Sequence, residues 1–266
     1  MDQYGPIGMF DSGLGGLSVL RELIGLVPSV DVVYVADSAH VPYGTKPPAF
    51  IRERSLSIAR FLLDAHHARG VVVACNTATT HAVATLRQTF PDVPIVGMEP
   101  ALKPAAAATR SGVVGVLATP ATLDGERFAD LAQRYTEGIE LLTQPSPGLV
   151  ECVEAGDVGG PEAERLLRLY TAPMLARGAD TIVLGCTHYP FLRDAIQRLV
   201  GPGVALIDTG AAVARQTARL LGTSDSALPA AHGRVTYYSS GNLAAAEQVI
   251  AGLMGQSIDH VLPLPV

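Results

Sequence analysis

Two of the three cysteines in this 266-residue chain occur in closely similar settings. Cys75 follows the apolar run 70–74, and Cys186 follows the apolar run 181–185. Each thiol is therefore expected where a buried strand turns into a helix, and a helix start lowers the pKa of a thiol from about 8.5 toward neutrality. The sequence predicts two reactive thiols, whereas Cys152 has no such setting and is expected to be a structural residue.

Polar side chains follow both thiols. Asn76 and Thr77 come after Cys75, and Thr187 and His188 come after Cys186. A histidine two residues from a thiol can tune its ionisation or donate a proton. Two matched thiols fit proton transfer at opposite faces of one carbon, because one group cannot reach both faces. No close pair of ligands precedes a second pair, so we expect no metal site.

A third candidate group lies at the end of the first apolar run. Asp11 ends the predicted strand 6–10 and precedes the glycine-rich segment 12–16, which opens a helix. Glycines allow the backbone to come close to a ligand, and free N–H groups at a helix start favour an anion. The segment is neither G-x-G-x-x-G nor a phosphate loop. A carboxylate here would repel phosphate but would suit an ammonium group or a thiol proton.

Polar residues, several of them with neutral hydroxyl donors, follow two further strands. Asp37 and Ser38 come before the proline- and glycine-containing turn 41–45, and Thr119 and Thr122 follow another apolar run. Turn and capping roles account for each of these residues alone. Together, at one end of the sheets, they indicate a site for carboxylates without excess positive charge.

Strand and helix patterns alternate along the chain, which is typical of parallel sheets covered on both faces. The expected strands are 6–10, 31–36, 70–74, 94–97, 112–117, 138–142, 181–185, 203–207 and 234–238. The expected helices are 15–27, 47–69, 77–90, 100–109, 121–135, 147–155, 160–177, 189–200, 210–222 and 242–254. Ligands in such folds bind beyond the carboxyl ends of the strands.

The similar cysteine segments favour an α/β fold of two pseudo-symmetric domains with mainly parallel sheets flanked by helices. We predict one domain from 1–98 plus 210–266, carrying Asp11 and Cys75, and a second from 99–209, carrying Cys186 and His188. The active site is expected in the cleft between them.

Composition excludes several classes of protein. Charged residues make up 17% of the chain and the net charge is −6, without the clustered basic residues of a nucleic-acid-binding surface. No apolar stretch is long enough to span a membrane, and no secretory signal is expected. The odd number of cysteines favours a reducing cytoplasm over a disulfide scaffold. Only Lys46 and Lys103 could form a Schiff base, and each precedes proline, so pyridoxal phosphate is a poor fit.

The motifs resemble those of the glutamate racemases in the aspartate/glutamate racemase family. The similar segments are F-D-S-G-L-G-G-L-S-V-L at 10–20, D-S-x-x-x-P-Y-G at 37–44, A-C-N-T-A-T-T at 74–80, the threonines at 119 and 122, and L-G-C-T-H-Y-P-F-L at 184–192. This resemblance implies cofactor-independent interconversion of L- and D-glutamate, which supplies D-glutamate for peptidoglycan. It also implies a homodimer, while the acidic balance of the chain argues against a nucleic-acid or membrane partner.

Roles for individual residues follow from this resemblance. Cys75 would act on D-glutamate with support from Asp11, and Cys186 would act on L-glutamate with support from His188 and Glu154. Glu151 is a rival to Glu154, because the segment 149–156 departs from the usual family pattern. The expected substrate-binding residues are Ser12, Asp37, Ser38, Pro42, Tyr43, Gly44, Asn76, Thr77, Thr119, Thr122 and Thr187, and among them Asn76, Thr77, Thr119 and Thr122 would hold the α-carboxylate.

Three alternatives remain open from the sequence. The substrate could be aspartate, because the length of the pocket cannot be read from the residues. Cys186 and His188 could instead form a nucleophilic hydrolase, which would leave Cys75 without a role. A two-lobed protein that binds an amino acid without chemistry is the third alternative.

Overall fold

The computed structural model describes residues 5–222 and 232–266 and contains two parallel β-sheets. The first sheet has the order β10-β9-β2-β1-β3-β4 and the second has the order β6-β5-β7-β8. The strands of the first sheet are β1 (Ile7–Asp11), β2 (Val32–Ala36), β3 (Gly70–Val73), β4 (Ile95–Val96), β9 (Val235–Ser239) and β10 (Val261–Pro263). Those of the second are β5 (Val113–Ala118), β6 (Glu140–Pro145), β7 (Thr181–Leu184) and β8 (Ala205–Ile207). The predicted fold class is confirmed.

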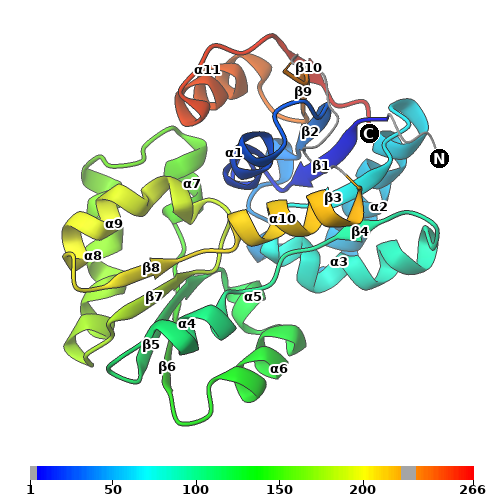
Figure 1. Cartoon of the computed structure of the whole chain (residues 1–266). Coiled ribbons are helices and arrows are strands. Elements are labelled where there is room, and N and C mark those ends of the chain that lie inside the picture. Colours follow the sequence, from blue (N-terminus) through cyan, green and yellow to red (C-terminus); the bar gives the residue numbers. More distant parts are fainter. Residues whose placement is uncertain (1–4, 223–231) are drawn as a thin grey trace.

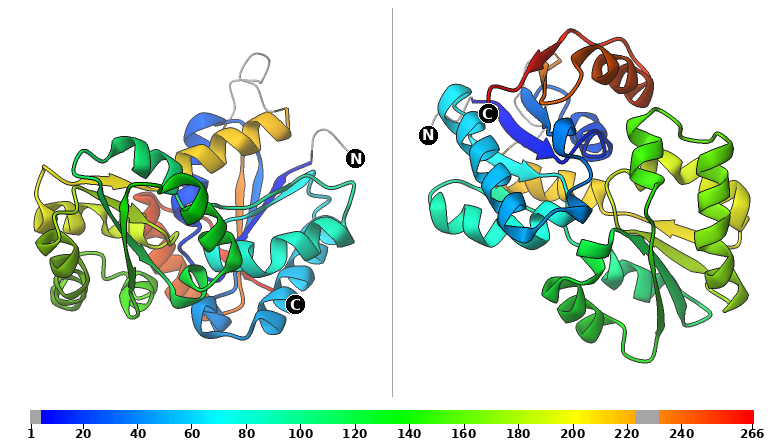
Figure 2. Two further views of the ribbon diagram at one scale, coloured as in Figure 1. Left: turned by 90° about the horizontal axis from the view of Figure 1, so that it is seen from below. Right: turned by 180° about the vertical axis from the view of Figure 1, so that it is seen from behind.

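Helices lie on both faces of each sheet, and Figures 1 and 2 show the two sheets as two lobes. The α-helices are α1 (Leu17–Leu26), α2 (Pro48–Arg60), α3 (Asn76–Thr89), α4 (Leu102–Ala108), α5 (Pro120–Leu123), α6 (Glu126–Tyr135), α7 (Leu149–Glu154), α8 (Pro161–Ala176), α9 (Arg193–Val200), α10 (Gly210–Leu220) and α11 (Leu243–Met254). The short 3-10 helices are η1 (Ser38–His40), η2 (Tyr43–Thr45) and η4 (Tyr189–Leu192), and η3 (Phe61–Ala65) is a π-helical turn. Within residues 5–222 and 232–266, none of the helices has the combined length and hydropathy of a membrane span.

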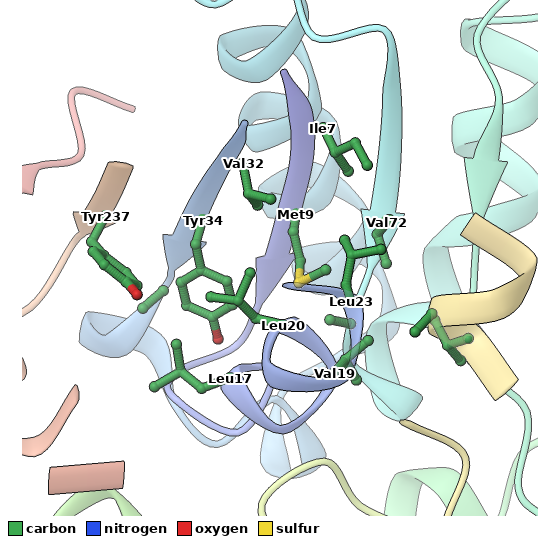
Figure 3. Packing of buried hydrophobic residues seen from close by; sticks show 14 of the residues in the cluster. Ile7, Met9, Leu17, Val19, Leu20, Leu23, Val32, Tyr34, Val72 and Tyr237 are labelled. Atoms are coloured by element: carbon green, nitrogen blue, oxygen red, sulfur yellow. The ribbon is translucent and has the colours of Figure 1, made fainter. Parts of the chain in front are cut away.

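Alternating side chains explain why the first sheet is buried on both faces. Met9 and Tyr34 point toward the core cluster that contains α1, whereas Phe10 and Val35 point toward the cluster on the opposite face. This period of two is the geometry of a β-strand. Figure 3 shows Met9 and Tyr34 packed beside side chains of α1. The carboxylate of β1, Asp11, accordingly stands at the end of its strand.

The two sheets share one strand order. The central strands run β2-β1-β3-β4 in the first sheet and β6-β5-β7-β8 in the second. In each, the chain first adds a strand on one side of the central strand and then crosses to the other side, and this switch point is where ligands of such folds bind. Asp11 and Cys75 lie at the switch point of the first sheet, and Thr119 and Cys186 lie at that of the second.

The chain passes between the sheets twice. Met98 packs in a core cluster of the first sheet and Ala101 in a cluster of the second. The helix α10, which follows β8, returns to the first sheet with Val213 packed in the cluster around α1. We call the elements of the first sheet the first half of the molecule, and the elements of the second sheet the second half. The domain limits at 98 and 209 stay a prediction, and residues 1–4 and 223–231 of the first predicted domain lie outside the described residues.

Several predicted element limits are wrong. The predicted helix 47–69 stops at Arg60 and continues as the π-helical turn η3, and the predicted helix 121–135 is split at Gly125 into α5 and α6. The strand predicted at 138–142 runs from Glu140 to Pro145, where it pairs with the full length of β5. The strand β10 was not predicted. It contains a proline and has only one buried residue, so it lacks the apolar run that marks the other strands.

Candidate active site

Cys75 lies two residues beyond β3 and is itself the N-cap of α3. Its Sγ accepts a hydrogen bond from the N–H of Ala78 at 3.4 Å, and the thiol lies 3.8 Å from Ser12 Oγ. The residue is only 5% exposed. The predicted position at a helix start is present, and the sulfur itself caps the helix.

Asp11 supports this thiol from the end of β1. Its carboxylate accepts hydrogen bonds from the N–H groups of Ser12 and Gly16, both at 2.7 Å, and Thr187 Oγ1 lies 3.4 Å from Oδ2. Burial raises the pKa of Asp11, although the positive His188 opposes this effect. A buried carboxyl with a raised pKa is a stronger base and is better able to receive a proton.

The predicted lowering of the Cys75 pKa is wrong for this conformation. Burial raises the pKa of Cys75 well above its usual value, and the negative charge of Asp11 raises it further. The hydrogen bond from Ala78 acts in the opposite direction but is the weaker effect. The helix start is therefore outweighed by desolvation and by the neighbouring carboxylate, neither of which can be read from the sequence.

Cys186 has different partners. It lies two residues beyond β7, and its Sγ is 3.6 Å from His188 Nδ1. On the other side of the imidazole, His188 Nε2 is 2.7 Å from Glu154 Oε1. The chain continues into the 3-10 turn η4, with Pro190 in its first turn, before α9 begins. Sulfur, imidazole and carboxylate form one continuous chain of hydrogen-bonding groups.

The charge on His188 follows from these two neighbours. Burial alone lowers the pKa of His188, but the hydrogen bonds and charges of Cys186 and Glu154 outweigh burial and raise it well above its usual value. An imidazolium donates from both ring nitrogens, to Sγ of Cys186 and to Oε1 of Glu154. The alternative Glu151 is an exposed residue of α7. The geometry therefore favours Glu154 as the partner of His188.

Both thiols line one small cavity between the two sheets. Its walls also contain Ser12, Pro42, Tyr43, Gly44, Asn76, Thr77, Thr119, Thr122, Val150, Thr187 and His188. Water can occupy only about 10 Å³ of it, which is room for about one molecule. Asp11 and Glu154 lie behind this wall, next to the thiol and the imidazole that they contact. The cavity brings together most of the predicted site residues in a closed conformation.

Three threonine hydroxyls gather at one end of the cavity. Thr119 Oγ1 lies 3.0 Å from both Thr77 Oγ1 and Thr122 Oγ1, and the last two lie 3.4 Å apart. Nearby, the side-chain oxygen of Asn76 is buried and makes no hydrogen bond. A buried polar atom without a partner costs about 1–3 kcal/mol. Neutral donors in this arrangement can bind a carboxylate without a lysine or arginine.

Asp37 and Ser38 were predicted to bind substrate, but neither lines the cavity. The buried carboxylate of Asp37 accepts hydrogen bonds from Tyr43 at 2.6 Å, from Arg54 at 2.8 and 3.0 Å, and from Ser240 at 2.8 Å. Burial opposes ionisation of Asp37, but Arg54 and the hydroxyl donors outweigh it, so its pKa is lowered. Asp37 therefore holds Tyr43 against the cavity from behind.

Sequence reasoning missed several residues of this site. Arg54 lies in the middle of α2, 17 residues from Asp37, and no local pattern links the two. Val150 lines the cavity but looks like an ordinary apolar residue of α7. Tyr34 donates to the carbonyl of Gly13 at 2.9 Å and supports the turn after Asp11. It lies in the middle of β2, and its local sequence pattern does not mark it as part of a site.

The fold and the site define an amino-acid racemase. The chain belongs to the Asp/Glu/Hydantoin racemase family, whose sequence model matches residues 11–217. It is 54% identical over 251 residues to the glutamate racemase of Ectopseudomonas mendocina, a match that covers 94% of this chain and 95% of that protein. It is 51% identical to the glutamate racemase of Pseudomonas entomophila, which it matches over 100% of this chain and 99% of that protein.

Solved structures give the same result. Escherichia coli glutamate racemase in complex with L-glutamate and the activator UDP-MurNAc-Ala has a TM-score of 0.85 at 36% identity, covering 98% of each chain. The glutamate racemase of Francisella tularensis in complex with D-glutamate has a TM-score of 0.83 at 26% identity, also covering 98% of each chain. These comparisons confirm the resemblance that the motifs indicated.

Proposed function

We propose that this chain interconverts L-glutamate and D-glutamate by proton transfer between two cysteines, without a cofactor. The observation that carries the proposal is the meeting of two thiols, from equivalent positions of two similarly ordered sheets, in one closed cavity. Each thiol has its own acid–base partner, which suits groups that exchange roles when the direction of the reaction reverses. The identity to glutamate racemases over nearly the whole chain supports glutamate as the substrate.

Conversion of L-glutamate would begin at Cys186. Its thiolate, paired with the His188 imidazolium, removes the α-proton, and the electron pair of the broken C–H bond passes into the α-carbon and its carboxylate. The thiol of Cys75 then gives its proton to the opposite face, forming the new C–H bond and leaving a thiolate. In the direction from D-glutamate, Cys75 acts first, and Asp11 receives its thiol proton.

The α-carboxylate is expected to lie among the hydroxyls of Thr77, Thr119 and Thr122. Charge grows on this carboxylate as the α-proton leaves, and donors held in place in a cavity without bulk water stabilise that charge. One such donor is typically worth about 3–4 kcal/mol to the rate. The side-chain NH₂ of Asn76 can supply a further donor, whereas its buried oxygen, which has no partner, is an acceptor and suits the substrate ammonium group.

The remaining substrate groups would be held by Ser12, Pro42, Tyr43, Gly44 and Thr187. The racemase would supply D-glutamate for peptidoglycan and act in the cytoplasm as a homodimer. Family resemblance supports these last three statements. Sedimentation of the purified protein tests the dimer, and rescue of a strain that depends on added D-glutamate tests the role in the cell.

Single alanine substitutions of Cys75 and Cys186 test the two-thiol mechanism. Circular dichroism of glutamate solutions should show no racemisation by either variant, whereas Cys152→Ala, which alters the buried third cysteine, should keep at least half of the activity. Activity should survive dialysis against a chelator in buffer without added cofactor. Near-normal turnover by either of the first two variants would exclude the mechanism.

Isotope labelling and a substrate panel separate the rivals. In D₂O, product formed from one enantiomer should carry deuterium at the α-carbon, because the proton that is added comes from an exchangeable thiol. Aspartate should turn over much more slowly than glutamate. A burst of acylated enzyme would instead favour a hydrolase built on Cys186 and His188, and binding without racemisation would favour an amino-acid-binding protein.

A further inference from the structure

The turn that follows β1 contacts side chains of both halves. The N–H of Gly16 donates to Asp11 in the first half at 2.7 Å, whereas the N–H of Leu14 donates to Glu154 Oε1 in the second half at 2.6 Å. The N–H of Gly15 lies 3.2 Å from His188 Nε2. Three consecutive amides therefore meet the three side chains that stand next to the two thiols.

Steric fit explains the glycines at 13 and 15. A Cβ on Gly13 would lie 2.2 Å from Glu154 Oε1, and a Cβ on Gly15 would lie 2.2 Å from His188 Nδ1. Neither glycine has a positive φ angle, so backbone conformation does not require glycine there. The requirement is close approach by side chains of the second half. Gly16 differs, because its Cβ would meet Asp11 and Tyr34 within the first half.

A serine adds another contact between the halves at the same place. Ser18 Oγ, in the first turn of α1, donates to the carbonyl of Thr187 at 2.8 Å and also lies 2.9 Å from the carbonyl of Gly15. Thr187 stands between Cys186 and His188, so this bond ties the start of α1 to the loop that carries the second thiol.

These contacts have to break when substrate is exchanged. The closed cavity has room for about one water molecule, and Cys75 and Cys186 are only 5% and 7% exposed. A five-carbon diacid cannot reach the thiols in this conformation. The two halves must separate, and the contacts between the turn and the second half lie on the path of that separation.

We propose that Gly13, Leu14 and Gly15 form a closure latch, which positions Glu154 and His188 beside Cys186 only when the two halves close. The proposal rests on the proposed function. The Leu14 amide fixes the Glu154 carboxylate, and the two glycines make room for Glu154 and for the imidazole. When His188 is protonated, Nε2 donates to Glu154 and cannot accept from Gly15, so Gly15 acts through its lack of a side chain.

The two thiols then differ in their dependence on closure. Asp11 and Cys75 belong to the same half and stay together when the halves separate. Glu154 and His188 also belong to one half, but the amide and the space that fix their orientation come from the other half. Opening should therefore disturb the partners of Cys186 and leave those of Cys75 in place.

Single methyl groups test the latch. Gly13→Ala and Gly15→Ala each add one Cβ against the second half, while Gly25→Ala is the matched control, because a Cβ at Gly25 in α1 meets nothing within 4 Å. Rates of iodoacetamide labelling, followed for each cysteine by peptide mass spectrometry, report opening. Cys152 is the internal control, because it is buried in the core of the second half.

We expect Gly13→Ala and Gly15→Ala to melt within a few degrees of the wild type and to lose at least 100-fold in kcat. Labelling of Cys75 and Cys186 should rise at least fivefold, with Cys152 unchanged, and saturating glutamate should no longer protect the two thiols. Gly25→Ala should match the wild type in every measurement.

Two results would overturn the latch. One is wild-type labelling and kcat in both variants. The other is an equal rise at all three cysteines with a fall in melting temperature, which would mean that the turn serves folding. Ser18→Ala, which adds no atom, should raise labelling of Cys75 and Cys186 about twofold or more. If the glycine variants do not fold, unchanged labelling in Ser18→Ala would contradict the latch. If the wild type fails to racemise glutamate, the proposed function is refuted. The difference in labelling rates between the glycine variants and the wild type would still test the latch.

Discussion

Replacing Glu154 with glutamine should weaken the half of the site that contains Cys186. Glu154 Oε1 accepts from the Leu14 N–H at 2.6 Å and from protonated His188 at 2.7 Å. The amide carbonyl of the introduced glutamine keeps the shape of the side chain and can still accept from Leu14. The substitution therefore removes chiefly the charge that faces the imidazolium.

The size of the loss follows from that one bond. A hydrogen bond between charged groups contributes about 1.5–3 kcal/mol, and this one is screened little, because the side chains of His188 and Glu154 are 2% and 14% exposed. Each 1.4 kcal/mol is a factor of about ten in rate. We expect kcat to fall by about 10- to 100-fold.

The pH profile gives a second measurement of the same bond. Glu154 is one of the groups that raise the pKa of His188. Without its negative charge, the imidazolium is less favoured, so the pKa of His188 falls. If loss of the His188 proton ends activity at high pH, the alkaline limb of the kcat/KM profile moves to lower pH in the variant.

Glu151→Gln is the matched control, because Glu151 is exposed on the same short helix. Circular dichroism at 25 °C, with each enantiomer as starting substrate, measures kcat and KM, and a thermal melt confirms that both variants are folded. Glu151→Gln should keep wild-type kinetics. Equal losses in the two variants, or a Glu154→Gln enzyme with more than half of the wild-type kcat, would refute the assignment.

Three further predictions concern other parts of the site. Asp37→Asn removes the buried partner of Arg54 and should lower the free energy of unfolding, measured with urea, by about 3 kcal/mol. Because the pKa of Asp37 is lowered in the folded state, this loss of stability should have its full size above about pH 4 and shrink as the pH falls further. Thr122→Val should reduce kcat/KM for glutamate by about 100-fold or more by removing one donor, with an unchanged melting temperature. In the unliganded protein, iodoacetamide labelling of Cys75 should keep rising above pH 9, and Asp11→Asn should move this rise to lower pH, because the carboxylate raises the pKa of the thiol.

Much of the fold could be predicted because parallel strands buried on both faces are continuous apolar runs. The segments that became β1, β3 and β7 are of this kind, and each is followed within two residues, or ended, by a polar or reactive residue. The strand β10 could not be predicted, because its pairing with β9 depends on the sheet already being formed. The end of α2 at Arg60 was also missed, because the residues of the following π-helical turn have ordinary helical patterns.

Residues at strand ends were the part of the site that sequence could place. The carboxyl ends of β1, β3, β5 and β7 supply Asp11, Cys75, Thr119 and Cys186 or lie next to them. Partners that come from elsewhere were beyond sequence reasoning. Glu151 and Glu154 lie three residues apart on one short helix, and only the direction in which α7 packs leaves one of them exposed and brings the other to His188.

The direction of the Cys75 pKa shift illustrates a different limit. The sequence correctly predicted a helix start at this thiol, and the amide of Ala78 does favour the thiolate. Burial and Asp11 act in the opposite direction and are stronger. Local patterns predict which dipoles a side chain meets, but desolvation depends on the closure of the other half over the site.

The strand order that the two halves share explains why two cysteines stand in equivalent places, yet it does not make their partners equivalent. The first half supplies the acid–base partner of its thiol from its own central strand, at Asp11, whereas the matching last residue of the corresponding strand in the second half is Ala118, which Thr119 follows. Thr119 joins the cluster of hydroxyls instead, so Cys186 needs partners from α7 and from the loop after β7. The Leu14 amide of the opposite half fixes Glu154, and the space at Gly15 of that half accommodates the imidazole. A carboxylate at residue 118 would restore the symmetry, but beside the hydroxyl of Thr119 it would repel the substrate carboxylate, and this conflict accounts for the asymmetry of the site.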